Sequence, residues 1–357
     1  MTPLADLLAA RIAADGPMTL ADYMAECLLH PRHGYYVTRD PFGAAGDFTT
    51  APEISQMFGE ILALCLAQCW LDQGRPPRVA LTEVGPGRGT LMADMLRALR
   101  SVPGMTAAAE VHLVEASPRL RARQRQTLGD QPAVWHDDLT TLPDLPLYLV
   151  ANEFFDALPI RQFVRAGPAW AERQVGLRDG RLTPGLAPPL PLAALAHRLS
   201  DTRDGDIVET CPALPAIAAA IASRIARRGG VALVIDYGGW RALGDTLQAV
   251  RQHRPVDPFA DPGQADLTAY VDFEALARAF RAGGAAASAM TPQGVFLTRL
   301  GIGLRAETLA RTLSAAALQS HVAAHRRLTH PAEMGDLFKV IACHPADRAL
   351  PPGLDPA

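Results

Sequence analysis

Apolar positions along the chain follow two spacings, and together these spacings predict a series of strands and helices. Short apolar runs such as 79–84 and 230–236 suit strands that are buried on both faces. Within 91–99, apolar residues recur with helical periodicity, which is typical of a helix packed on a sheet. Because strands that alternate with helices usually pair in parallel, the pattern predicts an α/β fold with a doubly wound, Rossmann-like sheet.

The predicted elements follow one another along most of the chain. Strands are expected at 79–84, 111–115, 133–136, 147–151, 230–236 and 337–343. Helices are expected at 4–14, 19–28, 55–70, 91–99, 118–128 and 272–281, with further helical segments between 301 and 326. Thr19 and Ser117 are the predicted N-caps of two of these helices.

Two stretches interrupt this order and bear on domain organisation. Residues 160–200 contain short predicted strands with turns at Gly167-Pro168 and Asp179-Gly180, whereas 240–271 is expected to be a polar loop. A chain of 357 residues suits about two domains. We therefore expect an N-terminal helical lid region at 1–78 and a second domain at 79–357. The second domain would carry inserted substrate-binding elements at 160–200, 240–271 and 301–330.

A glycine-rich turn separates the predicted strand 79–84 from the helix that follows it. Gly85, Gly87 and Gly89 would let the backbone approach a ligand closely, and the new helix would direct unpaired N–H groups toward it. In an open α/β sheet, such a turn binds a nucleotide or an anionic group. The alternative is an ordinary tight turn with a surface acid.

An acidic residue just ahead of this turn bears on which nucleotide binds. The carboxylate of Glu83, two residues before Gly85, would oppose a pyrophosphate, and Thr90 takes the place of a dinucleotide fold's last glycine. Both features favour S-adenosyl-L-methionine (SAM), which has an ammonium, a sulfonium and no phosphate. Glu115 falls near the acid that a NAD site carries about 20 residues past the glycines, so it suits both ligands.

Polar residues also stand at the ends of the other predicted strands, at the edge of the sheet where ligands bind. Glu115 is placed to accept hydrogen bonds from both ribose hydroxyls, and Asp138 from the adenine amino group. Asn152 and Glu153 follow the fourth strand and would face the reacting methyl group. For any one of these acids, a solvated loop charge or a helix cap is the alternative.

The stretch N-E-F-F-D-A-L-P places two aromatic residues, 154 and 155, between Glu153 and Asp156. The aromatic rings would wall a pocket or fill the core, the more usual position of phenylalanine. Asp47 and Glu53, on an earlier loop, are expected to close over this stretch as a lid.

Composition and charge exclude several classes of function. The net charge of −3 gives no basic surface for nucleic acid, and no segment reaches the ~20 apolar residues of a membrane span. Five scattered cysteines do not form a disulfide framework, so a reducing compartment is expected. Cys65 and Cys69 are interpreted as core residues, and we find neither a metal-ligand spacing nor a Ser/His/Asp triad.

Beyond these local signals, eight longer segments follow one another over residues 30–341: HPRHGYY, GDFTTAPEISQMFGE, EVGPGRGTLMADMLR, VEASPRLRARQ, NEFFDALPIRQF, VIDYG, DLTAYVDF and MGDLFKV. With these segments, in this order, the sequence resembles the mitochondrial complex I assembly methyltransferases and their bacterial relatives. These are SAM-dependent protein-arginine methyltransferases of the class I fold.

The resemblance implies where the cofactor and a protein substrate would bind. SAM would contact the following residues: Glu83, Gly85, Gly87, Gly89, Glu115, Asp137, Asp138 and Leu139. GDFTTAPEISQ and NEFFDALP would border the substrate cleft. The mitochondrial relative methylates an arginine of a core subunit of respiratory complex I, and by extrapolation the resemblance implies an arginine-containing protein of this kind as the partner. The chain begins almost at its first predicted helix without an Arg-rich transit peptide, so a bacterial cytoplasmic protein is expected, and a homodimer is compatible with the sequence.

Methyl transfer to arginine would need carboxylates in the site. A guanidinium is protonated in water and is a poor nucleophile until it loses a proton, which a carboxylate can hold and accept. Glu153 and Asp156 are the first candidates and Asp47 and Glu53 the next, although Asp236 or Asp266 could take any of these roles. The alternatives are a small-molecule methyltransferase, a non-catalytic SAM-binding assembly factor and, third, a NAD oxidoreductase.

Overall fold

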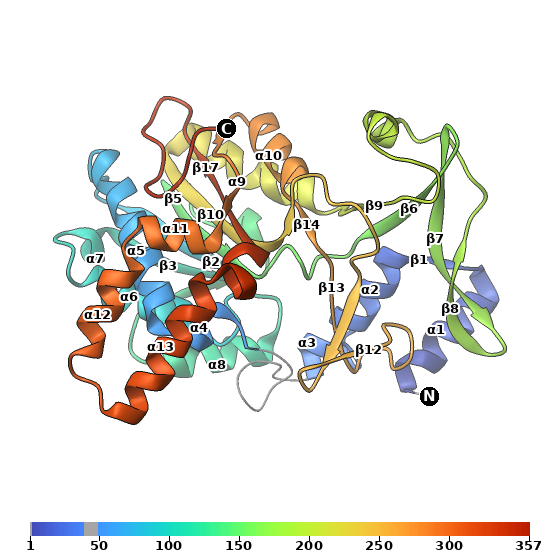
Figure 1. Cartoon of the computed structure of the whole chain (residues 1–357), viewed down its shortest axis with the longest axis horizontal. Helices are drawn as coiled ribbons and strands as arrows, with labels where there is room; N and C mark the ends of the chain where they lie inside the picture. The colour runs from blue at the N-terminus through green and yellow to red at the C-terminus, as the bar shows by residue number, and fades with distance from the viewer. Residues whose placement is uncertain (1, 39–48) are drawn as a thin grey trace. The chain divides into compact units, whose positions relative to one another are not determined.

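The computed structural model describes residues 2–38 and 49–357 and divides the chain into two compact units (Figure 1). Unit 1 contains the described part of 1–48 together with 156–214 and 241–272, and unit 2 contains 49–155, 215–240 and 273–357. The region 1–78, expected to form one lid, therefore contributes to both units. Asp47, an expected lid and catalytic residue, lies outside the described residues.

Unit 2 is built on a central, mostly parallel sheet, and the predicted α/β fold is confirmed. The sheet order is β15-β17-β10-β5-β2-β3-β4, and each of the neighbouring pairs from β10 to β4 is parallel. The strands are β2 (Val79–Val84), β3 (Ala109–Val114), β4 (Val134–His136), β5 (Leu147–Asn152), β10 (Gly230–Gly239), β15 (Ala286–Ala287), β16 (Thr291–Pro292) and β17 (Phe338–His344).

Helices pack against this sheet because their apolar residues meet those of the strands. Leu81 of β2, Leu113 of β3 and Leu233 of β10 share one core with buried apolar residues of α5 and α6. The helices of this unit are α4 (Ala51–Ile54), α5 (Gln56–Asp72), α6 (Thr90–Leu99), α7 (Met105–Ala108), α8 (Pro118–Leu128), α9 (Leu214–Arg228), α10 (Phe273–Ala282), α11 (Gln293–Arg299), α12 (Ile302–Ala310) and α13 (Ala315–Thr329).

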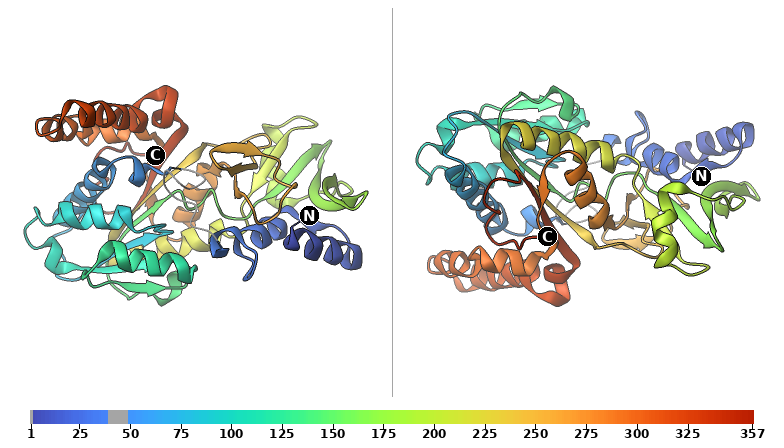
Figure 2. Two further views of the ribbon diagram at one scale, coloured as in Figure 1. Left: turned by 90° about the horizontal axis from the view of Figure 1, so that it is seen from below. Right: turned by 90° about the horizontal axis from the view of Figure 1, so that it is seen from above.

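Local sequence signals set several helix boundaries in unit 2. Ser117 caps α8 as predicted, since its hydroxyl accepts a hydrogen bond from the Leu120 N–H at 3.4 Å. The helical segments expected near 301–326 are α12 and α13, which lie side by side (orange to red in Figure 2). The predicted late strand is β17, but it pairs antiparallel with β10 rather than continuing the parallel order.

Unit 1 combines helices with antiparallel strands. Its core is formed by apolar residues of α1 and α2 together with β7 and β13. One sheet has the order β1-β7-β6-β9, with β8 paired to β7. The helices are α1 (Pro3–Asp15), α2 (Leu20–Leu29) and α3 (Tyr35–Thr38). The strands of this sheet are β1 (Met18–Thr19), β6 (Arg161–Ala166), β7 (Ala169–Arg178), β8 (Arg181–Leu186) and β9 (Ile207–Thr210).

The stretch 240–271 corrects one expectation from the sequence. It was expected to be a polar loop, but it contains a three-stranded antiparallel sheet in the order β12-β11-β13. Its strands are short and carry few apolar side chains, so their periodicity is weak in the sequence. They are β11 (Gln248–Arg251), β12 (Arg254–Val256) and β13 (Asp266–Thr268).

Candidate functional site

The glycine turn lies at the point in unit 2 where the strand order reverses. β2 pairs with β3 on one side and β5 on the other, which is the position at which α/β sheets bind ligands. Gly85, Gly87 and Gly89 all have positive φ angles, of 66°, 50° and 80°. A side chain at Gly85 would also meet the Phe154 ring at 3.0 Å. The turn therefore requires glycine for its backbone and for its close packing.

Glu83 is buried beneath this turn in the last part of β2. Its Oε2 atom has no hydrogen-bond partner among the described residues. Burial raises the pKa of the Glu83 carboxyl well above its ordinary value, a backbone N–H of Met92 lowers it, and the nearby Glu115 raises it further. A buried carboxyl of this kind fits a cationic ligand group, because the positive charge would stabilise its ionised form.

Glu115 follows β3 directly, at the neighbouring strand end. Its Oε1 accepts a hydrogen bond from the Ser117 N–H at 2.8 Å, and its Oε2 accepts one from the Gln124 amide at 3.2 Å. Burial raises the pKa of this carboxyl, while the hydrogen bonds from Ser117 and Gln124 and the positive charge of Arg121 lower it. The carboxylate is thus held in one orientation, as binding a pair of ribose hydroxyls would require.

The next strand end, after β4, carries Asp137, Asp138 and Leu139. Asp137 is exposed and pairs with Arg121. Asp138 caps the short 3-10 turn that begins at Leu139, accepting from the Thr140 N–H at 2.7 Å, and the hydrogen bonds of Thr140 lower the pKa of Asp138. This turn stands beside the end of β3, because β3 and β4 are paired neighbours.

Asn152 and Glu153 lie at the end of β5, on the other side of the glycine turn. Glu153 has a φ of 52°, which non-glycine residues rarely adopt. Its Oε1 accepts hydrogen bonds from the Asn152 side-chain amide at 3.0 Å and from the Ala51 N–H at 3.1 Å. The Oδ1 atom of Asn152 is buried without a partner among the described residues. Strained backbone of this kind is often found at functional sites.

Asp236 supports this strand end from β10. Its Oδ2 accepts from the N–H groups of Phe154 and Phe155, at 3.2 and 3.0 Å, and its Oδ1 from that of Tyr237 at 2.9 Å. Asp236 is completely buried. Its carboxyl therefore orders the backbone that follows Glu153.

Glu53, the other candidate on the early loop, contacts the glycine turn from α4. It accepts a hydrogen bond from the Thr90 hydroxyl at 2.6 Å and lies 3.8 Å from an Arg88 guanidinium nitrogen. The sequence identified Thr90 only as a departure from a dinucleotide turn, and the structure shows that its hydroxyl joins the turn to α4.

Asp156 and Asp266 belong to unit 1. The Tyr36 hydroxyl donates to Asp266 Oδ1 at 2.6 Å, and the Asp156 carbonyl accepts from the Ala269 N–H at 2.9 Å. Burial raises the pKa of Tyr36, and the negative charges of Asp266 and Asp156 raise it further. These two acids therefore lie near each other, and the chain passes from unit 2 to unit 1 directly after Phe155.

One buried residue of the site was missed in the sequence. Gln124 has no exposed surface and donates a hydrogen bond to the Gly87 carbonyl at 2.8 Å. The sequence could have revealed it by its spacing on α8. Gln124 lies four residues after Leu120 and four before Leu128, so it shares one face of the helix with two buried apolar residues.

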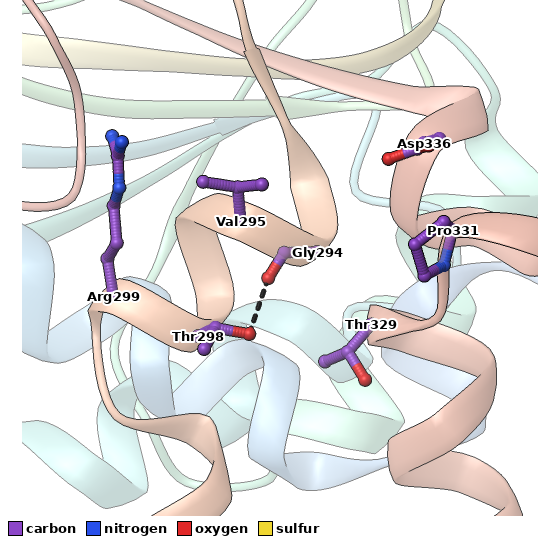
Figure 3. Close-up of a pocket in the computed structure, with 7 residues that line it drawn as sticks. All are labelled: Gly294, Val295, Thr298, Arg299, Thr329, Pro331 and Asp336. Carbon is purple, nitrogen blue, oxygen red and sulfur yellow. Dashed lines mark hydrogen bonds between the residues drawn. The ribbon is translucent and has the colours of Figure 1, made fainter.

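A surface pocket of about 280 Å³ lies elsewhere in unit 2 (Figure 3). The Thr298 hydroxyl on its wall donates to the Gly294 carbonyl at 2.6 Å. None of the predicted site residues lines it; its walls are Gly294, Val295, Thr298, Arg299, Thr329, Pro331 and Asp336. Within 2–38 and 49–357, no three His, Cys, Asp or Glu side chains could hold a metal ion. The helices of the same residues are too short or too polar to cross a membrane.

A family model and relatives that match this chain are all methyltransferases. A family of S-adenosyl-L-methionine-dependent methyltransferases matches residues 61–291. Protein arginine methyltransferase NDUFAF7, mitochondrial, of Xenopus laevis is 34% identical, with 95% of this chain and 83% of that protein covered. The protein of the same name from Homo sapiens is 35% identical, with 98% and 85% covered.

Two solved structures from Burkholderia thailandensis extend the likeness to the fold. One, bound to S-adenosyl-homocysteine, is 33% identical with a TM-score of 0.83 and covers 99% of this chain and 93% of that chain. The other is also 33% identical, with a TM-score of 0.79, and covers 99% and 92%. The buried Glu83 carboxyl and the glycine turn fit the cationic, phosphate-free cofactor of such enzymes. The chain therefore belongs to the family of S-adenosyl-L-methionine-dependent methyltransferases, and S-adenosyl-L-methionine is its cofactor.

Proposed function

We propose that this methyltransferase acts on an arginine side chain of a protein. The observation that carries the proposal is the orientation of Glu153, which two hydrogen bonds hold at the end of β5 beside the glycine turn. The names of the relatives, protein arginine methyltransferases, support the same acceptor. We assign cofactor binding to Glu83, Glu115 and Asn152, to the three glycines and to the turn 137–139.

Bound S-adenosyl-L-methionine would supply an electrophilic methyl group on its sulfonium. The task of the chain is then to present a guanidinium nitrogen that has lost its proton. Glu153 is our candidate to bind the guanidinium and accept that proton, because its carboxylate cannot turn away without breaking the hydrogen bonds from Asn152 and Ala51. Asp156 is the second candidate. Glu53 contacts Thr90 and Arg88, which supports a role in holding the turn, and Asp47 stays a prediction.

The acceptor protein and its compartment belong to the same proposal. The motif resemblance to complex I assembly methyltransferases supports a core subunit of respiratory complex I as the first acceptor to test. A cytoplasmic location is supported by the five cysteines, all of which are free thiols. The division into a region 1–78 and a domain 79–357, and a homodimer, stay predictions. Light scattering of the purified protein measures its assembly state.

The central experiment measures arginine methylation by the Glu153→Gln variant. Purified enzyme is incubated with methyl-deuterated SAM and a protein extract from cells that lack it, and labelled methylarginine is quantified by mass spectrometry. We expect the variant to lose about 10²- to 10⁴-fold in turnover, the usual contribution of a positioned acid or base. Binding of S-adenosyl-L-homocysteine should change little, since the amide keeps the shape of the carboxylate.

Glu110→Gln is the matched control, because Glu110 lies on β3 of the same sheet and forms a surface ion pair with exposed Arg78. Full activity in this control with near-normal activity in Glu153→Gln would remove Glu153 from the mechanism. If the deuterated methyl group appeared in small molecules but not in protein, a small-molecule methyltransferase would be favoured. Cofactor binding without any labelled product would favour a non-catalytic assembly factor.

A further inference from the structure

We propose that Gln124 is a positioning residue, whose side-chain amide couples the glycine turn to the carboxylate that binds the ribose. The inference rests on the proposed role of Glu115 in cofactor binding. It does not depend on the identity of the methyl acceptor.

Every hydrogen-bonding atom of the Gln124 amide is used. Its Nε2 donates to the Gly87 carbonyl at 2.8 Å and to Glu115 Oε2 at 3.2 Å, and its Oε1 accepts from the Trp135 indole N–H at 2.8 Å. Trp135 thereby fixes which way the amide faces, because only the NH₂ end can serve the turn and Glu115. The residue is completely buried, so water cannot replace these bonds.

The position on the helix argues for a specific role. Leu120 and Leu128 lie on the same stripe of α8 and are buried apolar residues, so packing alone would favour another apolar side chain. Gln124 also packs over the third glycine, since a side-chain carbon added at Gly89 would stand 3.4 Å from its Cα and Cγ. A single residue of α8 therefore binds one glycine of the turn, lies over another and binds the acid at the neighbouring strand end.

The carboxylate of Glu115 accepts hydrogen bonds from the backbone and from one side chain. The Ser117 N–H donates to Oε1 and a backbone hydrogen bond from Ala116 also reaches the carboxylate, whereas the side chain of Gln124 donates to Oε2. Loss of the amide would leave Oε2 free to rotate away from the ribose and would release the Gly87 carbonyl. Both changes would weaken the cofactor site without altering a group that touches the methyl acceptor.

The first test compares Gln124→Met with Gln126→Met, since Gln126 is exposed on the same helix. Calorimetry measures the binding of S-adenosyl-L-homocysteine and of its 2′-deoxyribose analogue. We expect Gln124→Met to bind S-adenosyl-L-homocysteine about tenfold more weakly, the usual effect of leaving a buried polar group unpaired. We also expect its preference for the ribose form to shrink, a change that a merely structural role would not produce. Gln126→Met should match the wild type in both.

A second test uses Gln124→Glu, which keeps the shape but adds an acid beside Glu115. The other charged groups around Glu115 are Glu83 on β2, Arg121 on α8 and, paired with Arg121, Asp137 after β4. Arg125 stacks on the Trp135 ring at 4.6 Å. Because two ionised carboxylates repel, binding should weaken in this variant as the pH rises and recover as it falls. The dissociation constant of the variant divided by that of the wild type should therefore rise as the pH rises.

Three outcomes separate the possibilities. If Glu115→Ala leaves binding unchanged, the proposed placement of the ribose is wrong, and this inference fails with it. If Glu115→Ala weakens binding but Gln124→Met does not, Gln124 has no positioning role. If Gln124→Met does not fold, Trp135→Phe removes the indole donor to Gln124 Oε1 while keeping an aromatic ring beside Arg125, and a folded variant with unchanged affinity and ribose preference overturns the proposal.

Discussion

Glu83 combines two properties that seldom occur together in a folded protein. Its carboxyl is buried, and one of its oxygens has no hydrogen-bond partner in the part of the chain that the structure describes. Such a group is destabilising as an anion unless a cation approaches it. With the cofactor's ammonium nearby the anion would be stabilised, so binding and ionisation of Glu83 should be linked.

This linkage predicts how cofactor affinity depends on pH. Burial raises the pKa of Glu83 in the free enzyme, and a bound cation would lower it, so binding should release a proton. Affinity for SAM should therefore increase as the pH rises toward the raised pKa and level off above it. Calorimetry in buffers of different ionisation enthalpy measures the proton directly. Glu83→Gln should bind weakly at every pH, and a wild-type affinity that is constant with pH would contradict the linkage.

At the scale of single residues, the sequence predicts which side chains stand at strand ends but not what they contact. Glu115 is the last residue of a predicted strand and Asn152 and Glu153 follow another, so their location could be inferred from periodicity alone. The bond between Glu153 and Ala51 spans 102 residues of sequence, and no local pattern encodes it. The positive φ of Glu153 is equally invisible, because its side chain is not of a type that favours it.

At the scale of elements, a side-chain hydrogen bond from Thr90 to Glu53 helps to join α4 to the glycine turn. Thr90→Val keeps the shape of the side chain but removes the donor to Glu53, so the carboxylate loses a charge-assisted bond. We expect a loss of about 1.5 kcal/mol in the free energy of unfolding, measured with urea, and weaker cofactor binding.

Thr127→Val is the control for this prediction. Thr127 lies on α8, where its hydroxyl donates only to a carbonyl one helical turn earlier, at 3.2 Å. Its replacement should change stability by less than about 0.5 kcal/mol. If the two substitutions lowered the free energy of unfolding equally, the hydrogen bond between Thr90 and Glu53 would contribute no more to stability than a bond within a helix.

Elements with strong local signals could be predicted and those with weak signals could not. β2 and α8 have the predicted boundaries, because an apolar run defines the first and Ser117 with a following proline the second. The strands of 240–271 are three or four residues long and mostly polar, so only their pairing with one another reveals them. The antiparallel direction of β17 likewise depends on how the chain returns to the sheet.

At the scale of the whole molecule, cofactor binding should stabilise one unit more than the other. At one hundred times its dissociation constant, S-adenosyl-L-homocysteine should add about 2.7 kcal/mol to the unit that binds it. For a unit of this size the melting temperature should rise by about 5–10 °C. Where calorimetry separates two transitions, only that of unit 2 should move, and Glu83→Ala should abolish the shift. An equal shift of both transitions would show that the units unfold together.

The interleaving of the two units has a consequence for synthesis of the protein on the ribosome. The chain alternates between the units in six consecutive stretches, and β17, which pairs with β10 over Ala232–Tyr237, follows every other strand of its sheet along the chain. A nascent chain that has reached the end of α13 therefore exposes an apolar edge strand with open backbone groups. Such edges pair with other chains, so the unfinished protein should depend on chaperones until β17 emerges.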